Sequence, residues 1–143
     1  MITLLVTLSL IYQRLWAAAG PQPSAKVRWT LLAPISLYLA WICVATIPNI
    51  SALLLTHGWD GAPLSGPLWA AIMMLVAAGI ITALAMRFAD GIAPLVLGWA
   101  LIGIVIKFPE QTLMRWVGIS LTVVMLGIAF AVRFRWPSRA LAV

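Results

Sequence analysis

Charged side chains are scarce in this chain of 143 residues, which holds nine Lys and Arg, three Asp and Glu, and one His. Charged residues make up 8% of the sequence, whereas soluble domains carry about 25%. Hydrophobic residues make up 64%, and the mean hydropathy is +1.11. Because so few charges cannot cover a surface that faces water, the composition excludes a soluble globular domain and indicates an integral membrane protein.

The same scarcity excludes several kinds of site. Cys43 is the only cysteine, so it cannot form an intrachain disulfide, and its apolar surroundings favour an inert thiol. His57, the only histidine, cannot build a metal site by itself. No nucleophile–base–acid set is recognisable, so we predict that the protein is not an enzyme. The three acidic residues all lie near expected loops, and we therefore predict no buried carboxylate in a membrane segment.

Five apolar segments can be recognised, at about residues 1–19, 29–56, 67–86, 91–107 and 113–132. A membrane span needs roughly 20 mostly apolar residues, and the chain has room for five or six at most. In lipid, every backbone polar group must find a partner within its own segment, which favours α-helices. The sequence therefore predicts an all-α fold, a polytopic transmembrane helix bundle of about five helices, in a single transmembrane domain over residues 1–143.

Positive charges at the segment ends predict how the bundle is oriented. The cations expected on one side of the membrane are Arg14, Lys26, Arg28, Arg87, Arg133, Arg135 and Arg139. Only Lys107 and Arg115 are expected on the other side. By the positive-inside rule, the first loop, the turn near Asp90 and the C-terminus face the cytoplasm. Cations placed one or two at a time favour membrane orientation over a nucleic-acid surface, so we predict no nucleic-acid partner.

The segment at 29–56 carries the most informative pattern. At 100° per residue, one helix face combines aromatic, small and polar residues: Pro34, Tyr38, Trp41, Ala45, Asn49 and Ala52. The opposite face is aliphatic apart from Cys43, and Pro48 predicts a kink. We expect the mixed face to turn toward protein, because its polar groups need partners. It could line a flat apolar pocket or serve ordinary helix packing, and the residue pattern alone favours packing.

The run from Tyr38 to Asn49 resembles the last core helix of the tryptophan-rich sensory protein family (TspO, or translocator protein, the peripheral-type benzodiazepine receptor). That helix typically reads P-Y-x-x-W-x-x-F-A-x-x-x-N. Tyr38, Trp41, Ala45 and Asn49 match it in register, whereas Leu37 replaces the proline and Val44 the aromatic residue. The eight tryptophans of the chain suit the same family.

The resemblance implies that residues 1–56 correspond to the family's last two helices and residues 57–143 to a three-helix C-terminal extension. The chain would then be the C-terminal portion of a longer bacterial TspO-like protein, placed in the bacterial inner (cell) membrane as a multi-pass protein. The first three family helices, which would bear much of the ligand pocket, would lie outside it.

The resemblance also implies a function. Proteins of this family bind tetrapyrroles or other flat apolar ligands within the helix bundle, so a porphyrin or haem is the expected ligand and no other cofactor is predicted. Tyr38, Trp41, Ala45 and Asn49 would line the pocket. The partners expected are the lipid bilayer, such an apolar small molecule, and a second copy or another membrane protein. The alternatives are a structural or assembly subunit of a membrane complex and, third, a small-solute transporter.

Overall fold

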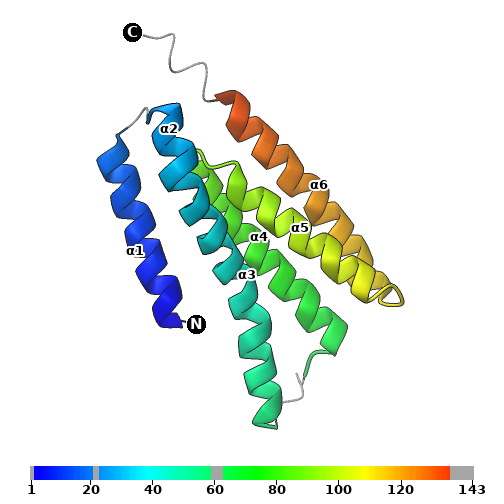
Figure 1. The fold of residues 1–143 in the computed structure, drawn as a ribbon. Helices are drawn as coiled ribbons and strands as arrows, with labels where there is room; N and C mark the ends of the chain where they lie inside the picture. Colours follow the sequence, from blue (N-terminus) through cyan, green and yellow to red (C-terminus); the bar gives the residue numbers. More distant parts are fainter. Residues whose placement is uncertain (1, 21–22, 59–62, 136–143) are drawn as a thin grey trace.

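A computed structural model of the chain describes residues 2–20, 23–58 and 63–135. Its helices are α1 (Ile2–Ala19), α2 (Ala25–Val27), the π-helical turn η1 (Arg28–Leu32), α3 (Ala33–Thr56), α4 (Gly66–Phe88), α5 (Ile92–Lys107) and α6 (Thr112–Arg135) (Figure 1). Because α2, η1 and α3 follow one another without a break, the described part forms five helical rods. The prediction of an all-α bundle of about five helices is confirmed.

Four of the rods are long and apolar enough to cross a membrane: Ile2–Ala19, Ala25–Leu54, Gly66–Phe88 and Thr112–Val132. The fifth, α5, has 16 residues, which at about 1.5 Å per residue gives a rod of about 24 Å. Large apolar side chains remain exposed along all five rods. In a bilayer these side chains face lipid, so the exposed apolar surface agrees with a multi-pass membrane protein.

Local sequence signals explain where the rods begin and end. Ser24 accepts a hydrogen bond from the backbone N–H of Val27 at 3.3 Å and so caps the start of α2. Ser65 precedes α4, and a proline occupies its first turn. Ala89 ends α4 in the left-handed conformation, with φ +50°. The next helix begins at Ile92, so α4 and α5 are joined by a very short turn.

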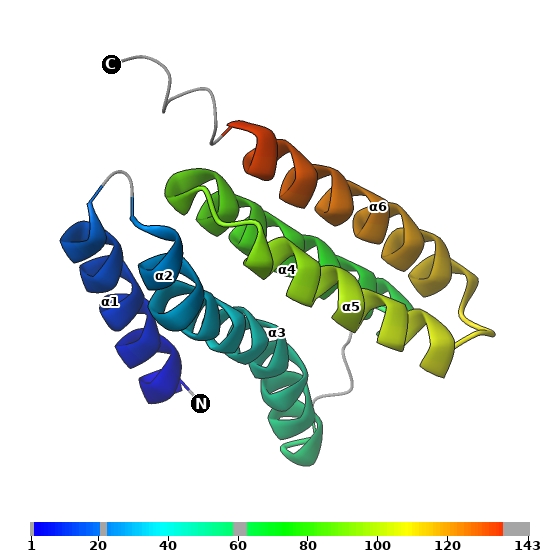
Figure 2. The same ribbon diagram turned by 45° about the horizontal axis from the view of Figure 1, so that its top comes forward.

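Successive rods run in opposite directions, so their connections alternate between two ends of the bundle (Figures 1 and 2). The last turn of α1, the start of α2, the α4–α5 turn and the last turns of α6 lie at one end, which we call the α1–α2 end. In Figure 2, α3 lies between α1 on one side and the group of α4, α5 and α6 on the other. Lys26, Arg28 and Arg87, which were predicted to share one side of the membrane, therefore lie at the same end, as do positions 133 and 135 at the end of α6. Arg139 lies outside the described residues.

The main core is formed by the four helices α3, α4, α5 and α6, and it depends on the close approach of α5 and α6. A Cβ atom added at Gly118 would lie 2.6 Å from Cγ2 of Val105, whereas one added at Gly98 would lie 3.9 Å from Cβ of Met125. Leu97, Leu101 and Met125 are almost completely buried between these helices. Glycine at the tightest contact lets the two backbones pack closely, as is common between membrane helices.

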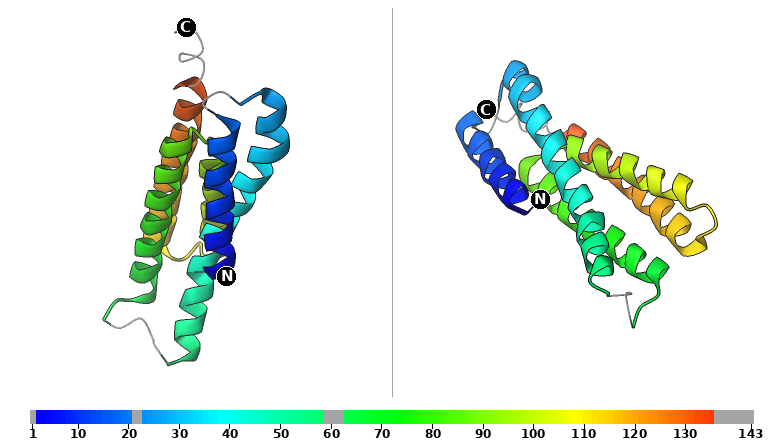
Figure 3. Two further views of the ribbon diagram at one scale, coloured as in Figure 1. Left: turned by 90° about the vertical axis from the view of Figure 1, so that its left-hand side faces the viewer. Right: turned by 60° about the horizontal axis from the view of Figure 1, so that its bottom comes forward.

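A smaller core attaches α1, which lies at the edge of the bundle against α3 (Figure 3). Leu8 and Tyr12 of α1 pack with Leu39 and Ile42 of α3, and partly buried side chains that include Trp16 and Phe88 surround them. The Tyr12 and Phe88 rings meet edge to face, with centroids 4.9 Å apart. Few side chains therefore hold α1 to the rest of the molecule.

The expectation that the mixed face of α3 turns toward protein is wrong. Leu39 of the aliphatic face is 2% exposed, whereas Tyr38 and Trp41 of the mixed face are 44% and 42% exposed. Cys43 and Ile47, also on the aliphatic face, pack against the main core. The Asn49 amide donates to the carbonyl of Ala45 within its own helix, at 2.7 Å. It therefore needs no partner from another helix.

Candidate ligand cavity at the α1–α2 end

The α1–α2 end contains a hollow because the α4–α5 turn lies deeper in the bundle than the end of α1 and the start of α2 do. Tyr12 contacts this turn, yet it lies seven residues before the end of α1. At about 1.5 Å per residue, the turn is recessed by about 10 Å from that end. The last turns of α1 and α6 and the first turns of α2 and η1 extend past it and form walls. The result is a cavity of about 680 Å³.

Asp90 forms the floor of the cavity. Its Oδ2 atom accepts hydrogen bonds from the hydroxyl of Tyr12, at 2.6 Å, and from the hydroxyl of Ser36. Its Oδ1 atom accepts from the backbone N–H of Ile92 at 2.8 Å, and its own N–H donates to the carbonyl of Ala85 at 3.1 Å. One carboxyl group therefore joins α1, α3 and the start of α5.

Asp90 is only 6% exposed, although it lies in the turn between α4 and α5. Because it is not part of a membrane helix, the prediction of no buried carboxylate in a membrane segment stays a prediction. The sequence places it in the short Ala89-Asp90-Gly91 turn, and such turns usually lie at the surface. Here α1, α3 and α6 cover the turn. A Cβ atom added at Gly91 would lie 3.3 Å from the carbonyl oxygen of Ala129, so glycine permits α6 to approach the turn closely.

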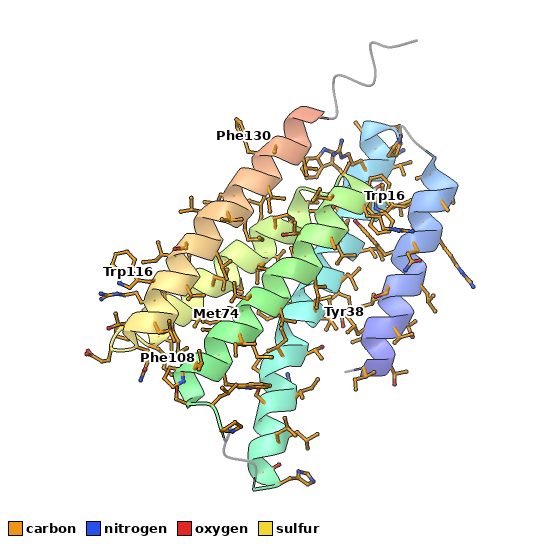
Figure 4. The ribbon with its side chains drawn as sticks, turned by 180° about the vertical axis from the view of Figure 1, so that it is seen from behind. Trp16, Tyr38, Met74, Phe108, Trp116 and Phe130 are labelled. Atoms are coloured by element: carbon orange, nitrogen blue, oxygen red, sulfur yellow. The ribbon has the colours of Figure 1, made fainter. Side chains whose placement is uncertain are left out.

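The walls of the cavity are rich in aromatic rings. The side chains that form them come from α1 (Tyr12, Trp16), from the chain leading into α3 (Pro23, Ala25, Arg28, Trp29, Leu32, Ala33) and from α5 and α6 (Ile92, Leu95, Leu126, Ala129, Phe130). Figure 4 shows Trp16 and Phe130 toward the same end of the bundle, whereas Phe108 and Trp116 lie toward the other. Trp29 and Phe130 are more than 60% exposed, so the cavity has an open, aromatic mouth.

The π-helical turn shapes one wall. Ala33 donates its backbone N–H to the carbonyl of Arg28, five residues earlier instead of four. Pro34 follows directly, and a proline has no N–H to donate to the carbonyl four residues before it. The extra residue in this turn sets the direction in which Arg28 and Trp29 project relative to Ser36. Single π turns often occur at functional sites.

The four residues predicted to bind a ligand do not line this cavity. Tyr38 and Trp41 lie on the exposed face of α3, Ala45 is half-buried, and Asn49 is exposed. Trp41 instead pairs with Trp99 of α5, with ring centroids 5.6 Å apart. This contact explains why these two tryptophans lie well inside apolar segments rather than at a membrane border. That the four residues contact a ligand stays a prediction.

The residues that build the cavity were missed because they are far apart in the sequence. Tyr12 and Asp90 are separated by 78 positions. One signal was available: Asp90 is one of only three acidic residues, and it adjoins two apolar segments without a polar loop. An acidic residue in such a place is a candidate for a buried role.

Comparison with known proteins identifies the family but supplies no close relative. Searches of curated proteins and of solved structures found no match. The family model described as TSPO-like protein matches residues 1–132. The match covers four rods in full and α6 up to residue 132, and so includes every residue that lines the cavity. The chain therefore belongs to the TSPO-like protein family.

Proposed function

We propose that this protein binds a flat, largely apolar small molecule, a tetrapyrrole or a ligand of similar shape, in the cavity at the α1–α2 end. The observation that carries the proposal is the cavity itself, of about 680 Å³ with Trp16, Trp29 and Phe130 in its walls. Ligand sites usually have volumes of about 300–1,000 Å³, mostly apolar walls and a few polar groups that orient the ligand.

The polar groups of the cavity suit a ligand with charged substituents. Arg28 is half-buried and lines the wall eight residues before Ser36 in the same rod. At about 1.5 Å per residue, Arg28 is therefore about 12 Å nearer the mouth than the hydroxyl that binds Asp90. A planar ring could lie between the aromatic walls while a carboxylate at its edge accepts hydrogen bonds from Arg28, as carboxylates do from guanidinium groups.

We propose binding rather than catalysis. Among the residues that line the cavity, Ser36 is the one whose side chain resembles a catalytic nucleophile. Its hydroxyl donates a hydrogen bond to Asp90. His57, the only histidine, follows the far end of α3, so it cannot act as a base for Ser36. Among the described residues, no group of three or more His, Cys, Asp and Glu could hold a metal ion.

The test is a titration of the purified chain with protoporphyrin IX, with quenching of tryptophan fluorescence as the readout. Trp29→Ala removes a cavity aromatic, and Trp99→Ala is the matched control, since the two side chains are 69% and 65% exposed. Trp29→Ala should weaken binding roughly fivefold, because one stacked aromatic pair contributes about 1 kcal/mol. Trp99→Ala should bind as the wild type does. Non-saturable quenching, or equal loss in both variants, would overturn the proposal.

A second candidate function concerns the exposed face of α3. Tyr38, Trp41 and Asn49 give this face aromatic and amide groups that a partner membrane protein or a second copy could contact. This observation favours a structural or assembly subunit. Crosslinking in native membranes from a photoreactive residue at position 41 should then capture one protein species. Capture of lipid alone would count against this function and against a ligand bound on that face.

We propose that the α1–α2 end faces the cytoplasm of a bacterial cell, across the inner membrane. Lys26 and Arg28 near the first loop and Arg87 beside the α4–α5 turn support this orientation, because cytoplasmic loops carry an excess of Lys and Arg. The cavity would then open toward the cytoplasm. The division into residues 1–56 and 57–143 stays a prediction, and the proposed ligand cavity draws residues from both parts.

A further inference from the structure

The carboxyl group at the floor of the cavity has no Lys or Arg among the hydrogen-bond partners that the described residues give it. The three hydrogen bonds that the Asp90 carboxyl group accepts come from two neutral hydroxyls and one backbone N–H. All three groups are able to donate, so the arrangement can satisfy an ionised carboxylate, which only accepts. Within the part of the chain that the structure describes, no Lys or Arg forms an ion pair with Asp90. Charged groups inside membrane proteins are usually paired, or they mark a functional site.

We propose that the cavity selects flat ligands that carry a protonated amine, and that the ammonium group binds the Asp90 carboxylate at the floor. This inference rests on the proposed function and adds a preference among the flat ligands that the cavity could bind. Asp90 lines the cavity although it is buried, which makes it the acidic residue nearest to a ligand bound there. A carboxylate has about four acceptor positions, and three are in use, so one more donor can be accommodated.

The rest of the cavity fits the same ligand. Trp16 of α1 and Phe130 of α6 both line the cavity. Aromatic faces attract cations as well as flat rings, so the walls favour both parts of an aromatic amine. Arg28 would repel the amine near the mouth, which directs the positive end of the ligand inward and any acidic substituent outward.

A purely structural role for Asp90 is the competing explanation. The carboxylate ties α1 and α3 to the start of α5 through its hydrogen bonds, and that role needs no ligand. The two explanations differ in what they require of the charge. Ligand selection requires the negative charge, whereas the structural role requires the acceptor oxygens.

The test compares two probes that share one ring system. These are 9-(aminomethyl)anthracene, which is cationic at neutral pH, and 9-(hydroxymethyl)anthracene, which is neutral. Binding to the purified full chain in nonionic detergent is followed by energy transfer from tryptophan to anthracene. The wild type should bind the amine about tenfold more tightly or better, since hydrogen bonds to charged groups are the strong ones. In Asp90→Asn, the affinities for the amine and the alcohol should differ by no more than about twofold.

Three variants control this comparison. Glu110→Gln removes the same charge from an exposed residue between α5 and α6 and should keep the preference for the amine. Tyr12→Phe and Ser36→Ala change residues that line the cavity, so both affinities should fall, but the amine should remain the tighter probe because the carboxylate is kept. Should Asp90→Asn fail to fold, equal affinities of the two probes for the wild type would still refute the inference.

The outcomes separate this inference from the proposed function. If both probes bind the wild type equally, the amine preference is refuted while ligand binding in the cavity stands. A preference that persists in Asp90→Asn also refutes it, because another group must then recognise the amine. If neither anthracene nor protoporphyrin IX binds, the proposed function fails, and this inference fails with it.

Discussion

The two tyrosines of the chain offer a matched test of how α1 is held. Tyr12 is 1% exposed and donates to Asp90 at 2.6 Å, whereas Tyr38 is 44% exposed on the outer face of α3. Replacing either residue by Phe removes one hydroxyl oxygen and keeps the ring. The ring contacts of Tyr12 with Trp16 and Phe88 should survive, so the substitution isolates the hydrogen bond.

The expected loss of stability follows from two ranges for the energy of a side-chain hydrogen bond. Hydrogen bonds to charged groups contribute about 1.5–3 kcal/mol in proteins, whereas side-chain hydrogen bonds between membrane helices average about 0.6 and reach about 1.7 kcal/mol. The Tyr12 hydroxyl is buried and its acceptor is a carboxylate, so the upper part of the membrane range applies. We expect Tyr12→Phe to lower the free energy of unfolding by about 1.5 kcal/mol. Tyr38→Phe should change it by less than about 0.5 kcal/mol.

The assay is reversible unfolding of the purified chain by SDS in mixed micelles, followed by tryptophan fluorescence. A double-mutant cycle with Asp90→Ala assigns the loss to the Tyr12–Asp90 pair. In the Asp90→Ala background, Tyr12→Phe should cost little or should stabilise, because the hydroxyl there has lost its acceptor. Equal effects of the two Tyr→Phe changes, or the same cost of Tyr12→Phe in both backgrounds, would refute the role assigned to this hydrogen bond.

Three further predictions test the packing, the π turn and the orientation. Gly118→Ala should destabilise the protein by about 1–3 kcal/mol, because the added methyl group overlaps α5. Gly127→Ala has no atom within 4 Å of the added Cβ, so it should be neutral or stabilise by up to about 1 kcal/mol. Thermal unfolding of both variants checks this prediction. Pro34→Ala restores a backbone N–H, so the π turn should revert to α-helix. The altered cavity wall should then bind protoporphyrin IX several-fold more weakly. Unchanged affinity would count against the role of the turn. In a cysteine-free background, Lys26→Cys should be protected from an impermeant maleimide added to intact cells, and Glu110→Cys should be labelled; the reverse pattern would overturn the orientation.

The five rods could be predicted from the sequence almost to the residue. The apolar run at 67–86 became Gly66–Phe88, and the run at 113–132 became Thr112–Arg135. This works because a membrane segment must satisfy its own backbone hydrogen bonds, so length and hydropathy within one segment decide the outcome. The largest difference is at the start of the second rod. It was expected to begin at about residue 29, but it begins at Ala25 because Ser24 caps it there.

Which face of each rod is buried was decided only by the tertiary structure. In a soluble protein the apolar face must turn inward, but every face of a helix in lipid can be apolar, so the pattern along α3 did not determine its rotation. Leu39 turned inward and Trp41 outward because α3 packs through Ser36 and Leu39 against α1 and the α4–α5 turn. The sequence by itself determined a five-helix membrane protein with one cationic end. The cavity and its buried Asp90 required contacts between residues 54 and 78 positions apart, which no local pattern encodes.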